Sequence, residues 1–156
     1  MQVFSSDDGY DTGNLPLGIL AGAIGALLAA LAWAAITAAT NFQIGFMAIG
    51  VGIVVAYAVR RFGHGHDGTF AIASGVLSLL GCLAGNFLAV VFSVAAHDHV
   101  PYLTVFVGLV PHIVDVFQQT FNFMDLIFYA IGIYYGYRYA TVPLRARTAV
   151  VPEQTP

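Results

Sequence analysis

An apolar run that stops at two adjacent arginines constrains this chain more than any other feature of its sequence. Residues 44–59 are sixteen uncharged and almost wholly apolar side chains, and Arg60 and Arg61 follow them directly. A surface helix of a small water-soluble protein carries a polar face, which this run lacks. The run therefore predicts a membrane span at 44–61, with the arginine stems reaching toward the membrane surface.

The composition indicates the same surroundings for most of the chain. Hydrophobic residues make up 59% of the sequence and charged residues only 8%, whereas soluble domains have about 25% charged residues. This number of charged side chains is too small to cover the surface of a globular protein in water. We therefore expect the lipid bilayer to be the main partner. The five basic residues are arginines that form no basic patch, which argues against a nucleic-acid partner. The single cysteine, Cys82, rules out an intrachain disulfide.

Three further apolar runs complete a set of four predicted spans, at 15–39, 44–61, 69–96 and 124–142. The first two are separated by four residues, which predicts an antiparallel helical hairpin. A polar, acidic leader occupies 1–14, and a tail expected to be disordered occupies 143–156. The predicted fold class is an all-α membrane protein, a four-transmembrane-helix bundle, with a glycine-rich loop at 62–68.

The region between the third and fourth spans contains two shorter apolar segments, 102–110 and 111–121, each at or just after a proline. Segments of this length are more often interfacial or re-entrant than spanning. The second segment is amphipathic at helical spacing, with Ile113, Phe117 and Phe121 on one face and His112, Asp115, Gln119 and Asn122 on another. We expect 101–121 to form a short extracytoplasmic interfacial helical segment, with a re-entrant pair as the alternative.

The distribution of positive charge predicts the orientation of the chain. With four spans, both termini and the 62–68 loop lie on one side, and this side receives every basic residue: Arg60, Arg61, Arg138, Arg145 and Arg147. The positive-inside rule then places both termini in the cytoplasm. A fifth span at 102–121 would move three arginines to the other side.

Small residues recur at every fourth position in the predicted spans and let helix backbones approach closely. These residues are Gly18, Gly22, Ala26, Ala30, Ala34 and Ala38; Ala48, Gly52 and Ala56; Gly81 and Gly85; and Gly132, Gly136 and Ala140. The pattern does not distinguish packing within a chain from packing between chains. A second stripe in the third span is more polar and consists of Ser74, Ser78, Cys82 and Asn86.

We interpret Asn86 and Ser78 as packing or pore-lining candidates. The amide of Asn86 lies close to mid-membrane and needs a partner in the protein. An interhelical hydrogen bond is the favoured interpretation, and the lining of a polar pathway is the alternative. Trp33 is expected as an aromatic anchor near the outer end of the first span, and Tyr137 and Tyr139 as part of a cytoplasmic aromatic belt.

Histidine and aspartate cluster at two points, in the 62–68 loop and on the outer side. The outer candidates for metal ligation are His97, Asp98, His99, His112 and Asp115. The favoured interpretation of both clusters is a polar loop at the headgroup level. No nucleophile elbow, phosphate-binding loop or paired-carboxylate spacing is present, so we expect no enzyme, no catalytic residue and no cofactor. No ionisable residue lies deep in a predicted span, which argues against proton-coupled transport.

Short motifs in three spans support a resemblance. They are Ile44-Gly45, Ala48-Ile49-Gly50-Val51-Gly52 and Ala58-Val59-Arg60; Gly81 through Gly85-Asn86; and Met124-Asp125-Leu126 with Tyr137-Arg138. In these motifs and in the order of its spans, the chain resembles a group of small, uncharacterised bacterial four-span membrane proteins. The resemblance implies a helical fold and a location in the bacterial inner membrane, and it implies no activity.

The expected function is that of a non-enzymatic, multi-pass integral membrane protein that acts by assembly. The assembly would be a homo-oligomer or a larger membrane complex of which this chain is a subunit. The first alternative is an ion or small-solute channel with residues 97–122 at its mouth. The second is a metal- or cofactor-binding membrane protein that uses the outer histidines and aspartates.

Overall fold

The computed structural model describes residues 13–40, 45–65 and 67–141, and about 90% of these residues are helical with no strand among them. The tail at 143–156 and most of the leader at 1–14 lie outside the described residues. The elements are α1 (Leu15–Thr40), α2 (Met47–Gly63), α3 (Gly68–Asp98), α4 (Tyr102–Leu109), the short 3-10 helix η1 (Val110–His112), α5 (Ile113–Thr120) and α6 (Phe123–Ala140).

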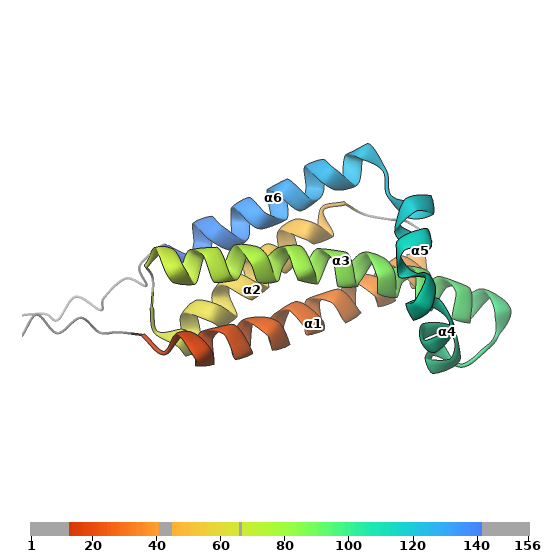
Figure 1. Cartoon of the computed structure of the whole chain (residues 1–156), viewed down its shortest axis with the longest axis horizontal. Coiled ribbons are helices and arrows are strands. Elements are labelled where there is room, and N and C mark those ends of the chain that lie inside the picture. Colours follow the sequence, from red (N-terminus) through yellow and green to blue (C-terminus); the bar gives the residue numbers. More distant parts are fainter. Residues whose placement is uncertain (1–12, 41–44, 66, 142–156) are drawn as a thin grey trace, which may run out of the picture.

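Four helices, α1, α2, α3 and α6, lie side by side as a bundle in which successive helices run antiparallel (Figure 1). Helices α2 and α3 contact each other, and each of them also contacts both α1 and α6. The pair α2 and α3 therefore forms the centre of the bundle, with α1 and α6 at opposite corners. We call α4, η1 and α5 together the end segment, which runs across one end of the bundle (Figure 1).

Polar groups at the helix ends explain where several helices begin and stop. The Leu17 amide donates to the Asn14 side-chain oxygen at 3.0 Å at the start of α1, as an N-cap does. At the start of α6, the Asn122 amide donates to an Asp125 carboxylate oxygen at 2.9 Å, which is one half of a capping box. Helices α2 and α3 end at His64 and His99, which adopt left-handed conformations with φ of 56° and 55°.

Both boundaries of α2 differ from those expected from the sequence, and those of α3 and α6 differ by one or two residues. Helix α2 begins at Met47 and not at 44, a residue that lies outside the described part of the chain. Phe62 and Gly63 belong to α2, so the loop expected at 62–68 is shorter. The backbone stays helical through Phe62 and Gly63 and leaves the helical conformation at His64. The His64 amide donates to the Arg60 carbonyl at 3.1 Å.

By length and composition, three described helical stretches are long and apolar enough to cross a membrane, namely α1, α3 and Tyr102–Thr120. Helix α2 has 17 residues, and α6 carries Asp125, Arg138 and five tyrosines; neither is among the three. The stretch Tyr102–Thr120 is interrupted by η1 at Pro111, and it is the end segment at the edge of the bundle.

Glycines at the helix crossings hold the bundle together by letting backbones meet. A Cβ atom at Gly52 of α2 would collide with the Gly132 carbonyl of α6, and one at Gly132 would lie 2.9 Å from the Ala48 carbonyl. On the other side of the bundle, a Cβ at Gly18 of α1 would lie 3.1 Å from the Val59 carbonyl. The small-residue stripes therefore pack against helices of the same chain.

Candidate functional site

The polar stripe of α3 lies against α6, and we call this contact the polar seam. The Ser74 hydroxyl donates to the Gly136 carbonyl at 2.8 Å, and the Ser78 hydroxyl donates to the Ser74 carbonyl at 2.7 Å. Ser74 and Ser78 are fully buried, and so is Cys82. The stripe is thus part of the contact between two helices, and each serine hydroxyl has an acceptor within the chain.

Asn86 lies one helical turn after Cys82, at the end of the polar seam that is nearer the end segment. Its amide donates to the Tyr129 hydroxyl at 3.0 Å, and Asn86 is 2% exposed while Tyr129 is 4% exposed. The interhelical hydrogen bond expected of Asn86 is therefore present, and Tyr129 is the partner that the sequence did not identify. A tyrosine in an aromatic helix is easily read as a lipid-facing anchor, and only the pairing of α3 with α6 shows otherwise.

Glycines on α6 make room for the seam. A Cβ at Gly136 would collide with the Ser78 hydroxyl, and one at Gly132 would lie 3.2 Å from the Cys82 sulfur. Gly132 and Gly136 are thus packing residues of the seam, and Gly52 packs on the α2 side of the same glycines. Gly18 and Gly22 are packing residues of α1. A Cβ at Gly22 would lie 2.7 Å from a Leu77 methyl group of α3.

Trp33 is buried, which corrects the expectation that it anchors α1 at the membrane surface. Its side chain is 2% exposed and lies over Gly85 of α3, where a Cβ would be 2.9 Å from the indole ring. Glycine at this position leaves the space that the ring fills. The indole Nε1 has no hydrogen-bond partner among the described residues.

The three arginines expected to orient the chain lie in the last turns of α2 and α6, which finish at the same end of the bundle (Figure 1). Arg60 donates from Nη1 to the Tyr139 carbonyl at 3.1 Å and so connects α2 to the last turn of α6. Arg61 is exposed, with its guanidinium carbon 6.0 Å from the centre of the Phe62 ring. Arg138 is exposed in the last turn of α6. Arg145 and Arg147 lie outside the described residues.

The outer histidines and aspartates do not converge on a common point. His112 Nδ1 lies 3.5 Å from an Asp115 carboxylate oxygen on α5, and both side chains are largely exposed. His97 and Asp98 are in the last turn of α3, and His99 follows it. Within residues 13–40, 45–65 and 67–141, no three histidine, cysteine or acidic side chains are grouped closely enough to hold a metal ion.

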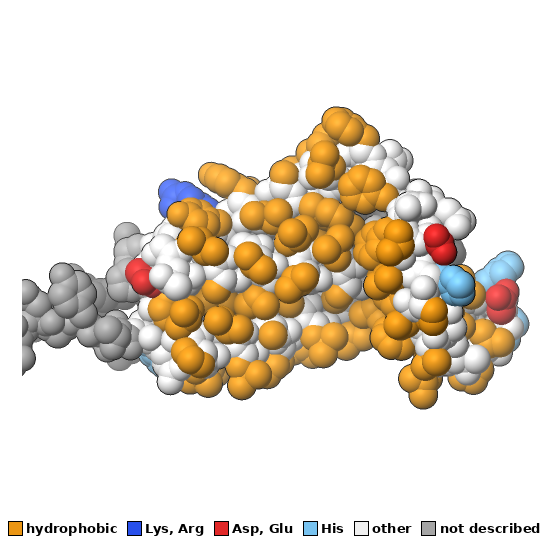
Figure 2. Space-filling model, viewed as in Figure 1, with side chains coloured by type: hydrophobic (Ala, Val, Ile, Leu, Met, Phe, Trp, Pro, Cys, Tyr) orange, Lys and Arg blue, Asp and Glu red, His pale blue; other side chains and the backbone are white. Residues whose placement is uncertain are grey.

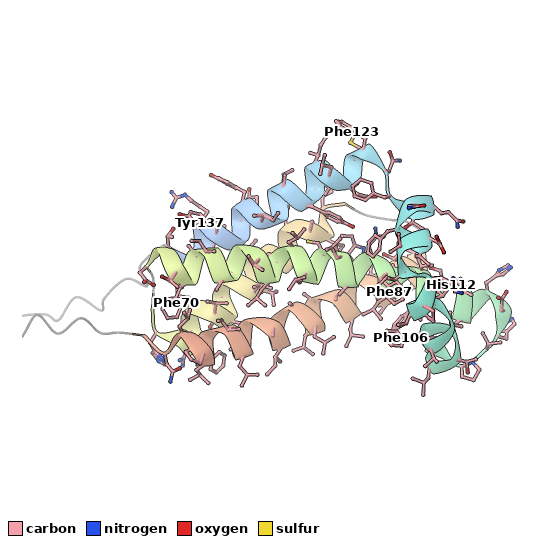
Figure 3. The ribbon with its side chains drawn as sticks, in the orientation of Figure 1. Phe70, Phe87, Phe106, His112, Phe123 and Tyr137 are labelled. Carbon is pink, nitrogen blue, oxygen red and sulfur yellow. The ribbon has the colours of Figure 1, made fainter. Side chains whose placement is uncertain are left out.

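The end segment packs on the C-terminal part of α3 through aromatic rings. The Phe87 and Phe106 rings meet edge to face with centres 5.8 Å apart (Figure 3), and the Phe92 and Tyr102 rings are 4.9 Å apart. Many other large apolar side chains of this segment are exposed, among them Leu103, Val107, Ile113 and Val114. The segment lies across the end of the four helices and not between them (Figure 1).

The two flanks of α5 differ in polarity. An apolar hollow of about 400 Å³ is lined by Ile113, Val114, Phe117, Gln118 and Phe121. A second hollow of about 400 Å³, between α3 and α5, is lined by Val90, Leu109, His112, Asp115, Val116, Gln119 and Thr120. The amphipathic pattern expected for 111–121 is therefore present in the folded chain.

The chain matches no family model, and it matches no curated protein and no solved structure.

Proposed function

We propose that this protein is a four-span integral membrane protein that acts without catalysis, by assembling in the membrane as a homo-oligomer. The packing of the helices supports four spans. Helices α2 and α6 run alongside α1 and α3 (Figure 1). If α1 and α3 cross the membrane, α2 and α6 therefore lie within it as well. Their 17 and 18 residues correspond to about 26 Å of helix, close to the ~30 Å of a hydrocarbon core.

The charge at the two ends of the bundle supports an orientation with both termini in the cytoplasm of a bacterium. Arg60, Arg61 and Arg138 lie at the end where α1 begins and α6 finishes. The histidines at the opposite end, near the end segment, are visible in Figure 2. In the bacterial inner membrane, the positive-inside rule directs the arginine end to the cytoplasm.

The position of the end segment and the polarity of its two flanks support a location at the outer membrane surface. It runs across the bundle axis, so it lies along the membrane plane if the bundle crosses the membrane (Figure 1). The break at Pro111 leaves two helices of eight residues each, too short to span singly. The apolar flank of α5 then contacts lipid, and His112 and Asp115 face the aqueous side.

An exposed stripe along α6 supports assembly with a second copy. Its residues alternate at spacings of four and three, as do those at the seam between two helices in a coiled coil. They are Phe123, Ile127, Ala130, Tyr134 and Tyr137, all of them exposed. Phe123, which is labelled in Figure 3, projects from the side of α6 that faces away from the bundle. We call these five residues the outer stripe.

Tyr134 is the single observation that carries the proposal of assembly. It is 60% exposed and lies six residues, or about 9 Å, from the end of α6. Side chains in a helix lean toward its N-terminus, which for Tyr134 is away from the arginine end and toward the membrane centre. Hydrocarbon offers a phenol hydroxyl no partner, whereas a neighbouring helix does. Tyrosine is also enriched at protein interfaces.

The small-residue stripes do not carry this proposal, because they pack within the chain. The polar seam gives the channel alternative little support, since Ser74, Ser78 and Asn86 are buried and bond to groups of the same chain. The metal-binding alternative has only the His112–Asp115 pair in its favour among the described residues.

Native mass measurement of the protein in detergent or nanodiscs tests the proposal. We expect the wild type to have the mass of two or more chains, and Ala130→Trp to have the mass of one, because the larger ring separates the outer stripes. The matched control is Ala32→Trp, at a similar distance from the outer end and exposed on α1 at the opposite corner. A monomeric wild type, or an Ala130→Trp variant that keeps its oligomeric mass, overturns the proposal.

A further inference from the structure

An apolar groove runs between α1 and α2 on the outside of the bundle. It has a volume of about 500 Å³, within the roughly 300–1,000 Å³ of small-molecule sites. Its floor is formed where the two backbones approach most closely, since a Cβ at Gly25 would lie 3.2 Å from the Ala58 Cβ. Its walls include Ile24, Leu28, Val54, Tyr57 and Phe62. The groove extends over about 10–14 Å of helix, judged from the rise per residue.

The groove extends to the last turn of α2, at the arginine end of the bundle. Phe62 lines it at that end, and the Arg61 guanidinium lies over the Phe62 ring. Tyr57 and Arg61 are four residues apart on α2, so they lie on the same helix face one turn from each other. The positive charge of Arg61 thus lies next to the end of the apolar groove that Phe62 lines.

Arg61 differs from its neighbour in what it contacts. Arg60 donates to the Tyr139 carbonyl and is engaged in joining α2 to α6. Arg61 is exposed, and its one described contact is with the ring of Phe62, which lines the groove. The acidic side chain described at this end is Asp67, just before α3. Among the described residues of this end, Arg61 is thus an exposed cation beside the groove.

We propose that this groove binds an anionic phospholipid of the cytoplasmic leaflet. An acyl chain lies in the groove between α1 and α2, and the phosphate pairs with the Arg61 guanidinium. Guanidinium binds phosphate through two parallel N–H donors, and basic positions between membrane helices bind anionic headgroups. A net negative headgroup is preferred because a zwitterionic headgroup brings its own cation to the phosphate. The inference rests on the four-span orientation proposed above.

Native mass spectrometry of the purified full chain, titrated with phosphatidylglycerol or with phosphatidylcholine of the same acyl chains, tests the site. The lipids are counted per chain, so the result does not depend on oligomeric mass. We expect one phosphatidylglycerol per wild-type chain to bind in preference to phosphatidylcholine. Arg61→Ala is expected to weaken this binding by roughly tenfold, the effect of about one charge-assisted hydrogen bond. Arg138→Ala, an exposed arginine of the same end on α6, is expected to retain the preference.

A second variant tests the groove itself. Ala21 lines the groove, and Ala21→Phe fills it, so both lipids are expected to be lost from the strong site while the protein still elutes as a single species. Equal binding of the two lipids by the wild type, an unchanged preference in Arg61→Ala, or undiminished lipid in Ala21→Phe overturns the proposal. Dissociation of an oligomer by Ala21→Phe without loss of lipid also overturns it, since a second copy then occupies the groove. If only the proposed assembly is wrong, the measured mass is that of one chain, and the number of lipids bound per chain is unchanged.

Discussion

Removing the hydroxyl of Tyr129 isolates the hydrogen bond that joins α3 to α6 at the polar seam. Tyr129→Phe keeps the ring, which lies 6.1 Å from the Phe121 ring, and deletes the atom that accepts from the Asn86 amide at 3.0 Å. Both side chains are at least 96% buried, so water does not replace the lost acceptor. The change therefore measures one interhelical hydrogen bond with little change in packing.

The magnitude follows from the membrane setting of this bond. Interhelical hydrogen bonds in membrane proteins are worth about 0.6 kcal/mol on average and up to about 1.7. Leaving a buried donor short of a partner costs about 1–3 kcal/mol. Asn86 has a further interaction besides the one with Tyr129, so the residue keeps one contact in the variant. We expect Tyr129→Phe to lower the free energy of unfolding by about 1 kcal/mol.

Reversible unfolding in mixed micelles of increasing SDS fraction is a suitable assay. A double-mutant cycle compares Tyr129→Phe, Asn86→Leu and the double variant with the wild type. It should give a coupling free energy of about 0.6–1.7 kcal/mol between the two side chains. Tyr139→Phe is the matched control, because this tyrosine is on the same helix and is 42% exposed. It is expected to change the stability by less than about 0.5 kcal/mol. A coupling free energy below about 0.3 kcal/mol would refute the assignment of this bond as a stabilising contact.

Two further predictions concern the bundle and its topology. Gly52→Leu is expected to destabilise the protein by about 3 kcal/mol or to abolish folding, since its Cβ would collide with the Gly132 carbonyl; Gly50→Leu, with nothing within 4 Å of its Cβ, should be tolerated, and equal unfolding curves for the two variants would contradict this packing. On a Cys82→Ala background, single cysteines at His99 and Asp115 should react with a membrane-impermeant maleimide added to intact cells, whereas a cysteine at His64 should react only after permeabilisation. Labelling of positions 64 and 99 from the same side would contradict the prediction that α3, which lies between them, spans the membrane.

The sequence by itself determined where the helices lie and which ends carry charge. These properties depend on local composition. Apolar runs form helices wherever backbone groups must bond within the segment, and Asp125 marks the start of α6 by accepting from the Asn122 amide. The amphipathic pattern of 111–121 likewise follows from spacing alone. With four spans that alternate in direction, the arginines at 60, 61 and 138 fall at the same end, because α2 and α6 both finish there.

Only the tertiary structure decided which helix faces which. The repeat of small residues is the same whether a stripe meets its own chain or another, so the sequence left both possibilities open. The pairing of α3 with α6 gave Asn86 its partner in Tyr129, and the crossing of α1 over Gly85 buried Trp33, which the sequence placed at the membrane surface. The outer histidines and aspartates stay apart for the same reason. Their separation depends on how the end segment folds against α3, a long-range contact that residue spacing does not encode.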